Sequence, residues 1–97
     1  MMIYPVGTRI HNHGDMANVE HSGTIVRAWA DRWGRHYEIQ IDDEDEAEGY
    51  RNHRYIIEAI MISPVYKGHG GTRIVTEAEY TRWRAKSLED FKARYSA

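Results

Sequence analysis

The chain has 97 residues, and its hydrophobic fraction of 41% and charged fraction of 29% are those of an ordinary globular protein. This composition predicts one folded domain and excludes wholesale disorder. The absence of cysteine excludes disulfides, thiolate metal sites and cysteine nucleophiles, and favours a cytoplasmic location. No apolar run approaches the ~20 residues of a membrane span, so we expect no membrane partner.

The formal net charge of −2 is unevenly distributed along the sequence. Residues 42–48 hold six of the fifteen acidic residues, which leaves thirteen basic against nine acidic residues elsewhere, a net charge of +4. The sequence therefore predicts a mildly basic body with one acidic loop. This balance is too weakly basic to predict non-specific nucleic-acid binding, for which a domain pI above ~9 is typical.

The N-terminal part predicts a strand that begins near Pro5 and includes Ile10. Residues 11–22 are rich in Gly, Asp and Asn, and a loop of this length is usually functional or mobile. Residues 23–42 predict the central β-hairpin, whose turn contains Gly34.

Each arm of this hairpin has an apolar alternation. In the second arm Tyr37, Ile39 and Ile41 alternate with polar residues, which is the pattern of a half-buried strand. In the first arm an unbroken alternation places Ile25 and Trp29 on the same face.

The region after the hairpin predicts a charged turn over residues 42–49 and a short strand at Tyr50 and Arg51. Residues 52–54 predict a turn. Residues 55–63 are nearly continuously apolar, and their isoleucines favour a strand over a helix. A glycine-rich turn at residues 67–71 follows.

The C-terminal segment predicts a helix from about Glu77 to Arg94. Thr76 and Glu79 have the spacing of a capping box at its start. Apolar residues then recur at helical spacing and form one stripe, which we expect to pack on the core or to form a dimer contact. The stripe contains Tyr80, Trp83, Leu88, Phe91 and Tyr95.

These elements predict a mainly β (β+α) fold, a small barrel of four or five antiparallel strands with a C-terminal amphipathic helix. We expect a single domain over residues 1–97, with the barrel at 3–75 and the helix at 76–95.

At residues 49–56, GYRNHRYI, the sequence resembles the end of SH3 domains. In that family a Gly-Tyr strand, a 3₁₀ turn and a Tyr-plus-β-branched pair close the barrel. The resemblance covers about half of the chain and implies an SH3-like barrel. Asn52 or His53 replaces the turn proline and the N-terminal ALYDY-type motif is absent, so it does not imply a proline-rich ligand. Residues 14–18 with 23–26 also resemble short uncharacterised reading frames of plasmids and phages.

Histidines and an aspartate near the first strand suggest a metal site. His11, His13 and Asp15, with His21 or His36, offer nitrogen and oxygen ligands that suit zinc or nickel. The alternative is that these histidines face solvent. No spaced metal motif is present, and we expect no cofactor.

The acidic loop has three interpretations: a solvated turn, a calcium site, or a surface that binds a basic partner in the manner of a nucleic-acid mimic. Its acidic residues are Asp42, Asp43, Glu44, Asp45, Glu46 and Glu48.

Arginines interleaved with aromatic residues mark the hairpin and its neighbours. This combination is typical of single-stranded nucleic-acid grooves, and cation–π binding of peptides or methylated lysine is an alternative. A third possibility is that Trp29 and Trp33 pack beneath the C-terminal helix. The residues are Arg27, Trp29, Arg32, Trp33, Arg35, Tyr50, Arg51 and Arg54.

We therefore predict a non-catalytic SH3-like binding module whose ligand is nucleic acid or a nucleic-acid-handling protein. Its ligand surface would be the hairpin with the loop at residues 12–22, and it would be a monomer or a helix-mediated homodimer. Two alternatives remain. One is an acidic-loop inhibitor from a mobile element, and the other is a metal-dependent hydrolase at the His/Asp cluster.

Overall fold

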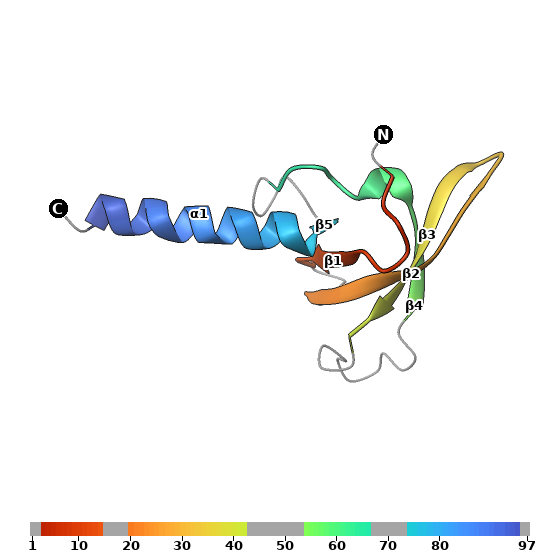
Figure 1. Ribbon diagram of the computed structural model, residues 1–97, viewed down its shortest axis with the longest axis horizontal. Helices are drawn as coiled ribbons and strands as arrows, with labels where there is room; N and C mark the ends of the chain where they lie inside the picture. Colours follow the sequence, from red (N-terminus) through yellow and green to blue (C-terminus); the bar gives the residue numbers. More distant parts are fainter. Residues whose placement is uncertain (1–2, 15–19, 43–53, 67–73, 96–97) are drawn as a thin grey trace.

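The computed structural model describes residues 3–14, 20–42, 54–66 and 74–95. Five strands form one antiparallel sheet in the order β4-β3-β2-β1-β5, and a single helix follows (Figure 1). The elements are β1 (Arg9–Asn12), β2 (His21–Asp31), β3 (Gly34–Ile41), β4 (Arg54–Glu58), the 3₁₀ helix η2 (Ala59–Met61), β5 (Ile74–Thr76) and α1 (Glu77–Tyr95). The predicted antiparallel β fold with one C-terminal helix is confirmed.

The predicted closure of the sheet into a barrel is not observed in the described residues. Within the described part of the chain the sheet is open, with β4 and β5 as its edges. One parallel bridge, between Ile62 and Ile74, joins the segment after η2 to β5, and the Ser63 amide donates to the Ile74 carbonyl at 2.8 Å. β5 therefore pairs with β1 on one side and makes a single bridge, at Ile62, on the other.

The core lies on one face of the sheet and follows the predicted alternation of β3. Tyr37 and Ile39 are almost fully buried, as are Ile10 of β1, Ile25 of β2 and Ile74 of β5. Burial of each such side chain contributes about 1.5–3 kcal/mol, so these residues dominate the stability of the sheet. Tyr4, Ile57, Ala59 and Ile62 complete the same cluster.

A β-bulge in β2 separates the two halves of that strand. Ile25 pairs with Ile39 but Arg27 pairs with Glu38, so Val26 is the extra residue. The prediction that Ile25 and Trp29 share a face is wrong, because the bulge moves Trp29 to the outer face while Ile25 stays in the core.

Two glycines allow the β2–β3 pairing. Gly34 has a φ of +115° at the hairpin turn, as predicted. At Gly23 a Cβ atom would lie 2.7 Å from the Gln40 carbonyl oxygen, so only glycine lets the two backbones approach this closely.

Several element boundaries differ from the predictions. His11 and Asn12 belong to β1, and His21 and Ser22 to β2, so the expected loop over residues 11–22 is shorter. Residues 55–58 are in β4, but residues 59–61 turn into η2.

The strand expected to close the barrel was also placed wrongly. Arg54, assigned to a turn, begins β4, which pairs with β3; the strand that pairs with β1 is β5. The predicted elements at Tyr50, Arg51, Asn52 and His53 lie outside the described residues.

Helix α1 spans Glu77–Tyr95 and projects away from the sheet (Figure 1). One half of the predicted capping box is present, because the Thr76 hydroxyl accepts a hydrogen bond from the Glu79 amide at 3.2 Å. The Glu79 carboxylate accepts instead from the Tyr66 amide at 3.3 Å and from Arg82.

None of the residues of α1, all of which the structure describes, is fully buried. The expectation that the stripe packs on the core holds for Tyr80 and Trp83, which contact the buried Tyr66, and is wrong for the exposed Leu88, Phe91 and Tyr95. No helix in the described ranges is long and apolar enough to cross a membrane.

Histidines of β1 and its extension hold the start of α1. The His11 ring stacks on Tyr80 with centroids 3.7 Å apart, and His13 meets the edge of Tyr66 at 5.8 Å. Tyr66 in turn contacts Trp83 at 4.6 Å. These five residues, the histidine–tyrosine cluster, fix only the first two turns of α1 and leave the rest of the helix in solvent.

Candidate ligand-binding surface

The β2–β3 hairpin extends beyond the rest of the sheet (Figure 1). β2 and β3 pair as far as Asp31 and Gly34, whereas the β3–β4 pairing ends at His36 and Glu58. The last residues of the hairpin therefore form a two-stranded ribbon whose side chains, at residues 30–35, are exposed to solvent.

The tip of this ribbon presents an exposed tryptophan. The Asp31 carboxylate accepts a hydrogen bond from the Trp33 amide at 2.7 Å, which fixes the turn. The Trp33 side chain is 73% exposed, and the Arg32 guanidinium lies over its ring at 4.8 Å from the centroid. A cation and an open aromatic face thus lie together at the tip.

A row of side chains on the outer face leads from the tip to the centre of the sheet. Trp29 stacks on His36 with centroids 5.5 Å apart, and the Arg27 guanidinium lies 4.2 Å from the Trp29 centroid. Arg27 also donates to Glu38 at 3.0 Å. Trp29 is therefore covered by neighbours, and the charge of Arg27 is already paired, so both residues are less available to a ligand than the tip.

The remaining predicted residues do not form one surface. Arg54 of β4 lies on the outer face, where its Nε donates to Gln40 at 2.6 Å. Arg35, opposite Ala30, lies on the other face of the ribbon, because residues 35, 37 and 39 of β3 share one side. Tyr50 and Arg51 lie outside the described residues. The alternative that Trp29 and Trp33 pack beneath α1 is wrong, since α1 begins at the other end of the sheet.

The predicted metal ligands serve a structural purpose where the structure describes them. His11 Nε2 is 3.4 Å from Glu20, and Nδ1 is 3.3 Å from the Ser22 hydroxyl. Burial lowers the pKa of His11, and the nearby Glu20 carboxylate partly opposes this shift. The neutral ring that burial favours stacks on Tyr80.

The other histidines are separated. His21 pairs with the Tyr55 hydroxyl at 2.7 Å, and His36 lies on the ribbon. No group of three or more possible ligands that could hold a metal occurs among the described residues. The predicted ligand Asp15 lies outside the described residues.

Of the acidic loop, the structure describes Asp42 alone. The Arg9 guanidinium donates to both carboxylate oxygens of Asp42, at 2.6 and 2.5 Å, and also to Glu77 at 2.8 Å. These bonds hold the pKa of Asp42 below its usual value and raise the pKa of Arg9. Asp42 is thus engaged within the fold. Asp43, Glu44, Asp45, Glu46 and Glu48 lie outside the described residues.

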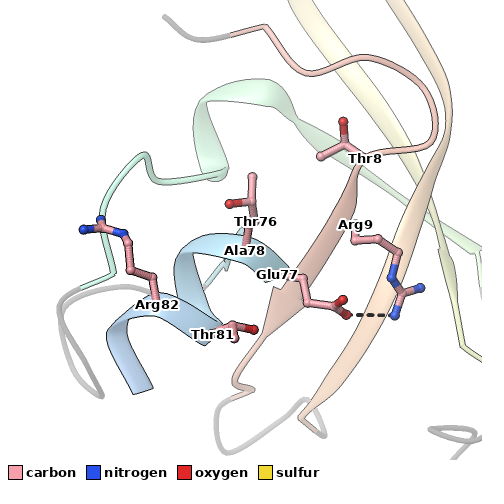
Figure 2. Close-up of a pocket in the computed structure, with 7 residues that line it drawn as sticks. All are labelled: Thr8, Arg9, Thr76, Glu77, Ala78, Thr81 and Arg82. Carbon is pink, nitrogen blue, oxygen red and sulfur yellow. Dashed lines mark hydrogen bonds and ion pairs between the residues drawn. The ribbon is translucent and has the colours of Figure 1, made fainter. Parts of the chain in front are cut away.

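A groove of about 670 Å³ lies between the start of α1 and β1 (Figure 2). It contains two arginines, but Arg9 is paired with carboxylates as above, and Arg82 donates to Glu79 at 3.1 and 2.5 Å. The groove thus has little uncompensated positive charge for an anionic ligand. Its lining residues are Thr8, Arg9, Thr76, Glu77, Ala78, Thr81 and Arg82.

Sequence reasoning missed this groove and the histidine–tyrosine cluster. Both join residues that are far apart in the chain, and no local pattern connects Arg9 with Glu77 or His11 with Tyr80. The capping box at Thr76 located the start of α1 but not what it packs against.

No protein-family model, curated protein or solved structure matches this chain.

Proposed function

We propose that this protein is a non-catalytic, SH3-like binding module that binds single-stranded nucleic acid through the tip of its β2–β3 hairpin. The observation that carries the proposal is the Arg32–Trp33 pair, with its aromatic face in solvent and a guanidinium beside it. Stacking of a base on an exposed aromatic ring contributes about 1–3 kcal/mol and depends little on sequence, and arginine binds the adjacent phosphates.

The order of the elements supports the SH3-like part of the proposal, although the residues that carried the resemblance occupy other elements. The resemblance implied a 3₁₀ turn near residues 52–54 and a closing strand at residues 55–56, whereas residues 55–56 belong to β4. The 3₁₀ helix η2 lies after β4, and the later strand β5 pairs with β1. The absence of cysteine accords with a cytoplasmic location, which we propose for the protein.

The charges of the hairpin make this binding weak. Of its arginines, Arg27 is paired with Glu38 and Arg35 lies on the other face of the ribbon, which leaves Arg32 as the main phosphate contact at the tip. One contact to a single strand gives a slope of about −0.7 for log K against log salt concentration. This modest slope accords with the mildly basic body of the chain.

The test is a titration of fluorescein-labelled oligo(dT), followed by anisotropy at two salt concentrations. We expect Trp33→Ala to weaken binding about 5- to 150-fold, in line with the loss of one stacked base. Arg32→Ala should weaken binding and reduce the salt slope by about 0.7. The matched control is Arg94→Ala, which removes an exposed arginine of α1 and should bind as the unaltered protein does.

Equal affinity of the Trp33→Ala variant and the unaltered protein would overturn the proposal. The alternative that the acidic loop binds a basic partner depends on residues 43–48. These lie outside the described residues, so the alternative stays a prediction.

A further inference from the structure

The strand β4 is an open edge of the sheet. Within the described residues it pairs with β3 on one side and has no neighbouring strand on the other. The opposite edge differs, because β5 makes a bridge to Ile62 on its outer side. β4 contains no proline and no lysine, and its pairing with β3 has no bulge. It therefore lacks the usual features that stop an edge strand from pairing with another strand.

The backbone of β4 alternates between the two sides, and the register shows which residues face outward. The Asp42 amide donates to the Ser22 carbonyl at 3.0 Å, so the even-numbered residues of β3 direct their backbone groups to β2. The odd-numbered residues of β3 therefore bond to β4, where they lie opposite Tyr55 and Ile57. The residues of β4 whose backbone groups point to the open edge are Arg54, Ile56 and Glu58.

The side chains of these same three residues share the outer face and are exposed. Arg54 donates through Nε to Gln40 at 2.6 Å, so its charge meets a neutral amide there rather than a carboxylate. Ile56 is 56% exposed. Along its open edge β4 thus presents a cation, an apolar side chain and an anion at even spacing.

We propose that β4 pairs with β4 of a second copy of this chain, in antiparallel orientation and centred on Ile56. The two-fold axis places Arg54 opposite Glu58 of the second copy, and Ile56 opposite its own counterpart. Each facing pair exchanges both backbone hydrogen bonds, so the two sheets become one continuous sheet. Because the axis repeats every contact, the interface closes as a dimer.

The order of the charges is what makes a second copy the occupant of this edge. Read in the antiparallel direction, β4 is complementary to itself, and opposite charges that face each other across two strands stabilise the pair. A parallel pair would place Arg54 opposite Arg54, where like charges repel. A shift of the antiparallel register by two residues, in either direction, would place a charged side chain opposite Ile56. The charges therefore select the partner, the orientation and the register together.

Backbone hydrogen bonds and two ion pairs, rather than a large apolar surface, stabilise this dimer. Five residues from each copy form an interface smaller than about 1,200 Å², which belongs to the weak, concentration-dependent class. The protein is thus a monomer at the low concentrations of a fluorescence experiment and a dimer when concentrated. Since the ion pairs are exposed, salt should weaken the association.

The first experiment is sedimentation equilibrium of the whole chain over a wide concentration range. We expect the average mass to rise above 11.4 kDa with concentration. The Arg54→Glu and Glu58→Arg variants each place like charges opposite one another, so each alone should stay at the monomer mass. An equimolar mixture of the two should associate, because the acidic edge of one variant faces the basic edge of the other.

The matched controls are Arg84→Glu and Glu89→Arg, which make the same charge changes at exposed positions of α1. Each should associate as the unaltered protein does. All of these substitutions lie at exposed positions and leave the core intact, which circular dichroism checks.

A second experiment tests the register, and the absence of cysteine from the sequence makes it direct. Facing residues of a hydrogen-bonded antiparallel pair have Cα atoms about 5.5 Å apart, which suits a disulfide. The Ile56→Cys variant should therefore form a disulfide-linked dimer in a glutathione redox buffer. The Arg54→Cys variant should not, because its counterpart lies four residues, or about 13 Å, along the strand.

A monomeric mass at every concentration would overturn the proposal, and so would single charge variants that still associate or a mixture of them that does not. Loss of association in the controls would place the contact on α1 instead. Cross-linking of Arg54→Cys as readily as Ile56→Cys would contradict the register. None of these results depends on nucleic acid, so the two proposals succeed or fail separately.

Discussion

The Arg9 ion pairs lead to a defined prediction for the substitution Asp42→Asn. Arg9 joins β1 to the end of β3 through Asp42 and to the first turn of α1 through Glu77. The Asp42 side chain is only 19% exposed, but that of Arg9 is 40% exposed, so solvent weakens the interaction. A charged, bidentate pair in this setting contributes about 1–2 kcal/mol, between the values for exposed pairs and for buried ones.

We therefore expect Asp42→Asn to lower the free energy of unfolding by about 1–2 kcal/mol at pH 7, and the melting temperature by about 4–16 °C. The effect should depend on pH with a known sign. The pKa of Asp42 is lower in the folded protein, so its stabilisation is present above the ordinary value of 3.8 and is lost as the pH falls through the folded pKa.

Urea unfolding between pH 2 and pH 7, followed by tryptophan fluorescence, measures this difference. The gap in stability between the unaltered protein and Asp42→Asn should close below about pH 4. The control is Glu58→Gln, which removes an exposed carboxylate of β4 and should change stability by less than about 0.5 kcal/mol. Equal stability at pH 7, or a gap that stays constant down to pH 2, would refute the reasoning.

Two further predictions concern the close contacts of the fold. Gly23→Ala should destabilise the protein by about 1–3 kcal/mol in urea unfolding, because its Cβ would lie 2.7 Å from the Gln40 carbonyl oxygen; an effect below about 0.5 kcal/mol would contradict this. His11→Phe keeps a ring on Tyr80 but cannot be protonated. Because the pKa of His11 is lowered by burial, the unaltered protein should lose stability as the pH falls below 6.5, and His11→Phe should lose less. Identical declines in the urea midpoint between pH 7 and pH 5 would count against this reasoning.

The elements that the sequence predicted well are those with a complete local signal. β3 alternates without interruption, so Tyr37, Ile39 and Ile41 were correctly assigned to the core. α1 has a capping residue at Thr76 and a long helical period, and its bounds agree with the prediction within one residue. In both cases the periodicity and the end signals point to the same structure.

The errors arose where tertiary contacts decide the structure. A bulge at Val26 reverses the faces of β2, and nothing in the local sequence marks it. The strand β5 has only three residues, too few to show a period, and pairs with β1 about sixty positions earlier. The apolar run over residues 55–63 contains a strand and a 3₁₀ turn, which composition alone cannot separate.

The candidate site was predicted in part. The sequence placed Arg32 and Trp33 in a hairpin turn, and the structure shows that Trp33 is exposed there. The side-chain pairings could not be predicted from the sequence. The ion pair of Arg27 with Glu38 and the stacking of Trp29 on His36 depend on the cross-strand register. The register is set by the bulge, and the sequence gives no sign of it.

The elongated shape of the molecule separates its two exposed aromatic regions. The hairpin tip and the end of α1 lie at opposite ends of the longest axis, which spans 54 Å (Figure 1). A short oligonucleotide bound at the tip therefore does not reach the end of α1, and a fluorescent label on the last turn of the helix would not sense that ligand directly.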